Sequence, residues 1–265
     1  MQIIYCEDEH KYKVYKYKRM ISEEEMKTRR EFYEYDASID TWNSFYLNVY
    51  FGGHGVETFK DNFDYTKPEE RGRRIVIPAK ENSVLVKNYQ DLWREKKIPG
   101  EPIDFYISGD CDIKYDGISE EDRHGLLNLS MMPITGGLND EKGSRGSVND
   151  VFSDYIKKLP DLISNPHSMP GKYKKELKEY KLEIVKCARQ AYFNLFDNNI
   201  DKYFYNVHFF GINDSDKSEK LLGLFEQVNR LLEDIKGNRI DEETLAKEYW
   251  KLRKEILKEK FGIDL

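Results

Sequence analysis

The feature that most constrains the fold is a change of hydrophobic period at one glycine-rich stretch, residues 126–150. Before it, apolar residues recur about every second position, which is typical of a half-buried strand. After it they recur every three or four positions, which is typical of an amphipathic helix. This order predicts an α+β fold, in which an N-terminal, mostly antiparallel β region packs on a C-terminal helical region.

The β-rich part is expected to cover about residues 1–135. Its predicted strands carry β-branched and aromatic residues between turn-prone segments, and they lie at residues 11–19, 32–35, 45–51, 74–77, 104–113 and 126–132. Short helices are predicted at residues 22–31 and 86–96. The polar segment 60–72 is predicted to be a loop.

The helical part is expected to cover about residues 147–265. Helices are predicted from Ser147 to Leu159 and from Lys172 to Leu195, whereas residues 200–211 fit a strand or a helix. Two apolar stripes, at residues 221–235 and 245–256, are joined by a short link and predict an antiparallel helical hairpin that ends the chain. Because no linker separates the two parts, we expect a single domain over residues 1–265.

Composition narrows the class of protein. The 265 residues are 39% hydrophobic, 35% charged and 14% aromatic, which indicates a folded and soluble chain. No apolar run approaches the roughly 20 residues of a membrane span, so no membrane partner is expected. The three scattered cysteines predict reduced thiols, and a cytoplasmic location is the expectation.

Nucleic acid is a minor candidate among partners. The net charge of −6 disfavours broad binding to a polyanion. The lysines that alternate with tyrosines over residues 11–19 allow phosphate contacts and base stacking, but a solvated lysine face is the commoner explanation. A homodimer through one of the two helical stripes is a second minority interpretation.

The glycine-rich loop is a candidate phosphate site. Its residues of interest are Gly136, Gly137, Lys142, Gly143 and Arg145, and a helix is expected to follow. Backbone N–H groups and a helix N-terminus attract anions, and glycines let a phosphate approach. The spacing matches neither a Walker A loop nor GxGxxG. The competing interpretation is a surface connection whose glycines supply left-handed turns.

Asp110 and Asp112 are the candidate metal ligands. On a strand they project to the same face, as a shared divalent metal requires. The alternative is a pair of solvent-facing acids at a strand end. No cofactor is predicted apart from Mg²⁺ or Mn²⁺ in this interpretation. The five histidines form no local metal-binding spacing, and no nucleophile motif surrounds the cysteines.

Two groups of short motifs carry a family resemblance. One is Tyr89–Trp93 followed by Ile98–Gly100 and Asp104–Phe105; the other is Met132–Asn139 followed by Lys142–Gly143. Together they resemble a family of uncharacterised bacterial proteins found in genomes and mobile elements, over about residues 85–205. The resemblance implies a setting in phage–host conflict and no particular activity.

The sequence therefore predicts a cytosolic binding or interaction protein with an unknown protein partner. The alternative is a metal-dependent enzyme that acts on nucleotides or nucleic acid. It would hold phosphate at residues 136–146 and a metal at Asp110 and Asp112.

Overall fold

The computed structural model describes residues 2–6, 11–15, 56–71, 74–114, 125–142, 148, 151–169, 173–216 and 218–263. The predictions for residues 22–31, 32–35 and 45–51, and for Gly143 and Arg145, lie outside these residues. Within them, the α+β prediction is confirmed: the strands lie between residues 2 and 133, most of the helices follow them, and every described strand pair is antiparallel.

The strands form two sheets. A hairpin pairs β1 (Gln2–Cys6) with β2 (Lys11–Tyr15). The second sheet has the order β3-β4-β5-β6, and its strands are β3 (Glu69–Arg71), β4 (Arg74–Pro78), β5 (Tyr106–Cys111) and β6 (Leu129–Pro133). In its central pair Gly109 lies opposite Met131, and Asp110 lies opposite Ser130.

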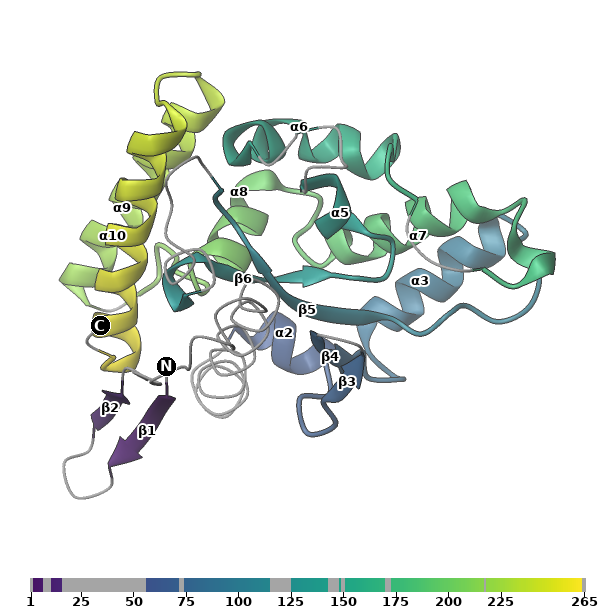
Figure 1. The fold of residues 1–265 in the computed structure, drawn as a ribbon, viewed down its shortest axis with the longest axis horizontal. Coiled ribbons are helices and arrows are strands. Elements are labelled where there is room, and N and C mark those ends of the chain that lie inside the picture. Colours follow the sequence, from purple (N-terminus) through teal and green to yellow (C-terminus); the bar gives the residue numbers. More distant parts are fainter. Residues whose placement is uncertain are drawn as a thin grey trace, which may run out of the picture.

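The helices follow in the order that Figure 1 shows. Their bounds are α2 (Glu57–Asn62), α3 (Val84–Glu95), η3 (Leu126–Asn128), α5 (Leu138–Lys142), α6 (Phe152–Ser164), η4 (Lys175–Leu177), α7 (Lys181–Asn194), α8 (Ile200–Tyr203), the π-helix η5 (Phe204–His208), α9 (Glu219–Lys236) and α10 (Glu242–Phe261).

Helices α5, α6 and α8 lie on one side of β5 and β6, and α2 lies on the other (Figure 1). The α9–α10 hairpin stands beside one end of the sheet, as predicted. Ser218 and Asp241 are the N-cap residues of its two helices, and their side chains accept from backbone N–H groups of the first turn. Buried apolar residues from Phe59 to Ile263 form one continuous core, which the single-domain prediction requires.

Strand β6 is buried along its whole length although it is an edge strand. Among the described residues, side chains and not another strand cover its outer carbonyls. The Tyr192 hydroxyl donates to the Met131 carbonyl at 3.0 Å, and the Arg253 guanidinium donates to the Leu129 carbonyl. These bonds satisfy polar groups that water cannot reach and prevent pairing with another chain.

Several predicted boundaries are wrong. Residues 60–72 contain the end of α2 and all of β3, and the predicted strand at 126–132 begins with the turn η3. Helix α6 begins at Phe152 and continues past Pro160, where the sequence pattern suggested an end. Helix α7 begins only at Lys181. Residues 200–208 are helical, and their aromatic rings pack into the core.

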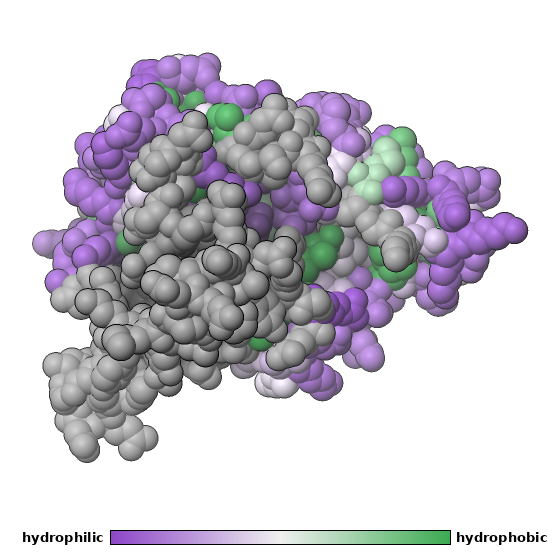
Figure 2. All heavy atoms as spheres, in the orientation of Figure 1, coloured by the Kyte–Doolittle hydropathy of each residue, from purple (hydrophilic) through white to green (hydrophobic). Residues whose placement is uncertain are grey.

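On the face shown in Figure 2, hydrophilic side chains cover most of the described surface, and hydrophobic ones appear as small separate areas. The exposed large hydrophobic side chains in the described residues are Val84, Ile103, Met169 and Leu182. No helix among the described residues is both long and apolar enough to span a bilayer.

Candidate functional site

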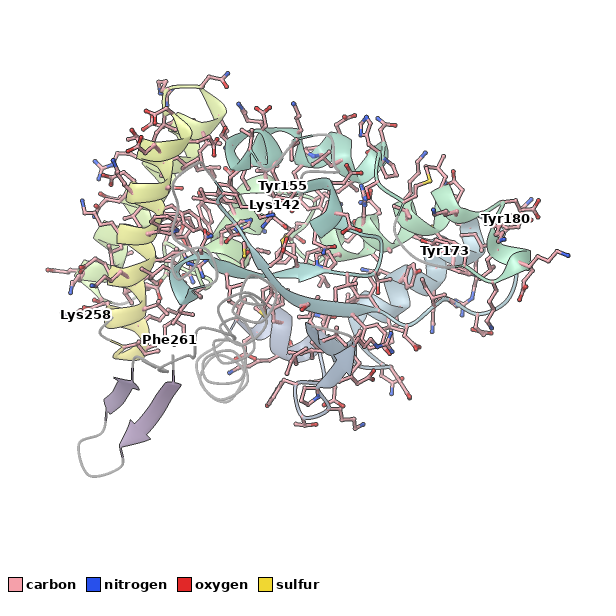
Figure 3. The ribbon with its side chains drawn as sticks, in the orientation of Figure 1. Lys142, Tyr155, Tyr173, Tyr180, Lys258 and Phe261 are labelled. Atoms are coloured by element: carbon pink, nitrogen blue, oxygen red, sulfur yellow. The ribbon has the colours of Figure 1, made fainter. Side chains whose placement is uncertain are left out.

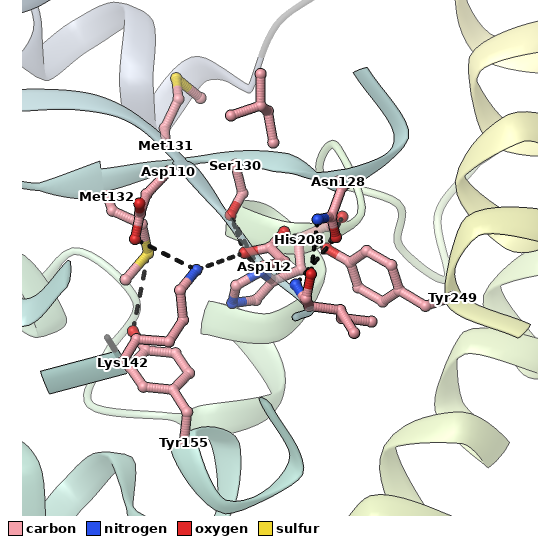
Figure 4. Close-up of polar contacts among 12 residues, drawn as sticks. Asp110, Asp112, Asn128, Ser130, Met131, Met132, Lys142, Tyr155, His208 and Tyr249 are labelled. Atoms are coloured by element: carbon pink, nitrogen blue, oxygen red, sulfur yellow. Dashed lines mark hydrogen bonds and ion pairs between the residues drawn. The ribbon is translucent and has the colours of Figure 1, made fainter. Parts of the chain in front are cut away.

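A cluster of charged and polar side chains, all buried except the half-buried Asp110, lies where β5, β6, α5, η5 and α10 meet. Asp112 is at its centre, one residue past the end of β5, and its side chain is fully buried. The members, several of which Figure 4 labels, are Asp110, Asp112, Asn128, Ser130, Lys142, His208, Tyr249 and Arg253. We call this set the Asp112 cluster.

The two oxygens of Asp112 face different elements. Oδ1 accepts from the Lys142 ammonium of α5 at 3.0 Å and from the Ser130 hydroxyl, and it lies 3.2 Å from Nδ1 of His208. Oδ2 accepts from the Tyr249 hydroxyl of α10 and lies 3.4 Å from an Arg253 nitrogen. One carboxylate therefore joins the glycine-rich segment to the C-terminal hairpin.

Both predicted metal ligands face the same way, as the strand period indicated. The Lys142 ammonium lies 3.0 Å from Asp112 and 3.6 Å from Asp110. Figure 3 shows Lys142 beside Tyr155 in the interior, and the ammonium lies 5.8 Å from the centre of that ring. A lysine that the sequence assigned to a phosphate site thus neutralises the two acids that the sequence assigned to a metal.

The charges of the cluster are maintained by one another. Burial by itself would raise the pKa of Asp112, but the Lys142 ammonium, a hydrogen bond from the His208 imidazole and the Arg253 guanidinium hold that pKa well below its ordinary range. Burial would lower the pKa of Lys142, and the two aspartates raise it instead. Burial lowers the pKa of His208 and outweighs the attraction of Asp112, so the imidazole is neutral.

Arg253 connects this cluster to the backbone. One guanidinium nitrogen donates to the His208 carbonyl at 2.7 Å and to the Tyr249 hydroxyl at 2.9 Å. The other donates to the carbonyls of Leu126 and Leu129. Such a fork of donors matches several acceptors that would otherwise be buried without partners.

A second buried ion pair organises the glycine turn. Arg189 of α7 lies 2.9 Å from Glu141 and also donates to the carbonyls of Gly136 and Gly137. Both glycines are buried and have positive φ, +81° and +60°. A Cβ at Gly136 would lie 2.9 Å from Cβ of Ala188, so this glycine allows α7 to pack against the turn.

The N-terminus of α6, the described helix that follows the glycine-rich segment, is occupied by a carboxylate of the chain itself. Glu242 of α10 accepts from the backbone N–H groups of Phe152 and Ser153 at 3.3 and 3.1 Å. An acid at a helix N-terminus is stabilised by the exposed N–H groups and the helix dipole. The N–H groups at the start of α6 are therefore paired with a carboxylate of the same chain.

These contacts assign structural roles to the candidate residues, and phosphate binding and metal binding stay predictions. Asp112 is surrounded by protonated donors, so the geometry lends a metal site no support. Among the residues that the structure describes, no group of three or more histidine, cysteine or acidic side chains is arranged to hold a metal ion.

Sequence reasoning missed His208, Tyr249, Arg253 and Arg189. The two arginines could have been found from the sequence, because each lies within the apolar face of an amphipathic helix. A lone charge at such a position predicts a buried acid elsewhere in the fold. His208 had no such signal, since it follows an aromatic run whose structure was ambiguous.

Comparisons with family models, with curated proteins and with solved structures found no match to this chain.

Proposed function

We propose that this chain is a cytosolic binding protein that acts by recognising a protein partner, without catalysis. The observation that carries the proposal is that the candidate catalytic and ligand-binding side chains, Asp112 and Lys142, form an ion pair with each other in the interior. The side chains of Asp112 and Lys142 are 0% and 1% exposed. A general acid, base or metal ligand has to meet a substrate, and these two side chains are covered by the surrounding protein.

The Asp112 cluster serves the proposed function as a scaffold. Its bonds fix the sheet, the glycine-rich segment and the C-terminal hairpin in one arrangement. Buried ionic groups add little net stability but favour the one arrangement that pairs them all. A rigid scaffold lowers the entropic cost of binding, which is what a recognition protein requires.

A second candidate function has one specific observation in its favour. Asp110 is 19% exposed and lies 3.6 Å from the Lys142 ammonium, so one acid of the pair is accessible from outside. In this alternative, the protein is an enzyme that acts on nucleotides or nucleic acid with Mg²⁺ or Mn²⁺ at Asp110 and Asp112. The glycine-rich segment then faces the phosphate.

One experiment separates the two functions. Calorimetric titration with Mn²⁺ and a thermal-shift screen against nucleotides with and without Mn²⁺ are applied to the wild type and to Asp110→Asn. Within the part of the chain that the structure describes, Asp110 makes a single long ion pair, so this variant is expected to fold. The binding-protein proposal predicts that neither protein binds Mn²⁺. Saturable Mn²⁺ binding that Asp110→Asn abolishes would overturn it in favour of the enzyme.

The partner is sought by affinity purification from bacteria, with and without phage infection, since the sequence resemblance suggests that setting. A candidate is accepted only if the two purified proteins form a complex of fixed stoichiometry by analytical ultracentrifugation. The same measurement on the protein alone detects a homodimer. The proposal expects complex formation to be unchanged by a chelator.

A further inference from the structure

The segment that leads into α7 carries exposed lysines whose charges are not paired within the described fold. Lys174, Lys175 and Lys178 are exposed, and among the residues that the structure describes no acid forms an ion pair with them. Exposed lysines of α6, α8 and α10 behave differently, because each lies within 4 Å of an acid: Lys158, Lys202 and Lys251. In a chain with a net charge of −6, this segment is therefore a local source of uncompensated positive charge.

The spacing of these lysines gathers them on one side of the segment. A series of turn hydrogen bonds joins η4 to α7, so side chains three or four positions apart share a side. Lys178 accordingly shares its side with Lys174, Lys175 and Leu182. The glutamates of the segment repeat at the same spacing on another side: Glu176, Glu179 and Glu183. The two signs of charge are therefore separated around the segment, and the lysines form one basic strip.

Apolar and aromatic side chains accompany the basic strip. Tyr173 and Tyr180 are half-buried against the core, at the end of the molecule away from the α9–α10 hairpin (Figure 3). The Lys181 ammonium lies 5.6 Å from the centre of the Tyr173 ring. Leu182 is 37% exposed, which few large hydrophobic side chains among the described residues are. Aromatic and apolar groups within a charged rim are the usual composition of a protein–protein interface.

We propose that this surface binds a segment of the protein partner that is acidic and also carries aromatic or aliphatic side chains. Carboxylates of such a segment pair with the lysines, and its apolar side chains contact Leu182 and the tyrosine rings. The inference rests on the proposed function, because it names the chemistry of that protein partner. We call this set the Lys178 surface, and its members are Tyr173, Lys174, Lys175, Lys178, Tyr180, Lys181 and Leu182.

Single-stranded nucleic acid fits the same surface less well. A phosphate backbone is a continuous line of negative charge, and its affinity grows with the number of cations that it meets. The neighbouring glutamates and the net charge of −6 repel such a polyanion. A peptide places its carboxylates at separate positions, so it reaches the lysines and avoids the glutamates.

Fluorescence anisotropy of the full-length protein with labelled probes tests the proposal. The probes are a peptide of alternating glutamate and tyrosine, a peptide of the same length with serine in place of tyrosine, and single-stranded oligothymidylate. We expect saturable binding of the glutamate–tyrosine peptide that weakens as salt is added, because exposed charges are screened. The glutamate–serine peptide should bind more weakly, and oligothymidylate more weakly than the glutamate–tyrosine peptide.

Two charge variants and one apolar variant locate the site. The triple variant Lys174→Gln, Lys175→Gln, Lys178→Gln should bind the glutamate–tyrosine peptide about tenfold more weakly, since each exposed ion pair contributes a fraction of a kcal/mol. The matched control Lys158→Gln, Lys202→Gln, Lys251→Gln changes the net charge equally and should alter binding less than about twofold. Leu182→Gln should weaken the glutamate–tyrosine peptide severalfold and leave the glutamate–serine peptide unchanged.

The replaced side chains are exposed, so all three variants are expected to fold, which circular dichroism checks. The assignment is overturned if the glutamate–tyrosine peptide does not bind, if the control triple variant weakens it as much, or if Leu182→Gln leaves it unchanged. Tighter binding of oligothymidylate than of either peptide would make this a nucleic-acid surface instead. Each of these results removes the Lys178 surface alone, because the Mn²⁺ titration decides the proposed function separately.

Discussion

Replacing Asp112 with asparagine is the most informative single change to this protein. The asparagine has nearly the same shape, so it leaves no cavity, but it removes the negative charge between Lys142 and Arg253. Its amide also turns an N–H₂ group towards one set of donors, either at Lys142 or at Tyr249. Removing one partner of a buried ion pair costs about 3–5 kcal/mol, because the remaining charge stays buried without compensation.

This decrease in the free energy of unfolding of Asp112→Asn is large, because domains are usually stable by only roughly 5–15 kcal/mol. Urea denaturation followed by circular dichroism measures it as a lower midpoint with an unchanged slope. Asp110→Asn is the matched control. Its carboxylate is partly exposed and 3.6 Å from Lys142, so we expect a loss of about 1 kcal/mol or less.

A second variant checks the cause. In Asp112→Asn combined with Lys142→Met, one uncompensated cation is absent, so we expect about 1–3 kcal/mol of the loss to be recovered. The reasoning is refuted if Asp112→Asn costs less than about 1 kcal/mol, or if removing Lys142 adds fully to the loss. A metal site would behave differently: the asparagine would abolish Mn²⁺ binding and leave the stability of the metal-free protein nearly unchanged.

The remaining predictions use the same denaturation assay. Gly136→Ala should lower the free energy of unfolding by about 2 kcal/mol or more, because φ at this position is +81° and the new Cβ would approach Ala188. Gly223→Ala should instead raise the free energy of unfolding by about 0.5–1 kcal/mol, because Gly223 lies in the middle of α9 and a Cβ there meets no other atom. Arg189→Met should cost about 3–5 kcal/mol because Glu141 stays buried without its cation, and a loss below 1 kcal/mol would contradict this. Because the pKa of His208 is lowered in the folded protein, the unfolded chain binds more protons at mildly acidic pH. The contribution of His208 to stability is therefore complete above about pH 6.5 and decreases below that pH by up to about 1.4 kcal/mol per pH unit. His208→Gln should flatten that decrease between pH 6.5 and 5.5, and an unchanged pH profile would refute the assignment.

Several parts of this structure could be predicted from the sequence because their causes are local. The α9–α10 hairpin follows from two apolar stripes at helical spacing, and the strand at Arg74–Pro78 follows from its β-branched residues. The common face of Asp110 and Asp112 follows from the two-residue period of a strand. In each case a short window of residues contains the information, since helix and strand geometry are periodic.

The identity of the contacts was decided by the tertiary structure. Lys142, Arg253 and Asp112 are far apart in the chain, and no local pattern shows that they meet. Their pairing follows from burial, because a charge removed from water requires a partner wherever the fold can supply one. The sequence by itself therefore determined the α+β class, the helical hairpin at residues 219–261 and the candidate charged residues. Only the tertiary structure decided that these charges bind one another, because the long-range packing of α5 and α10 against the sheet brings them within 4 Å.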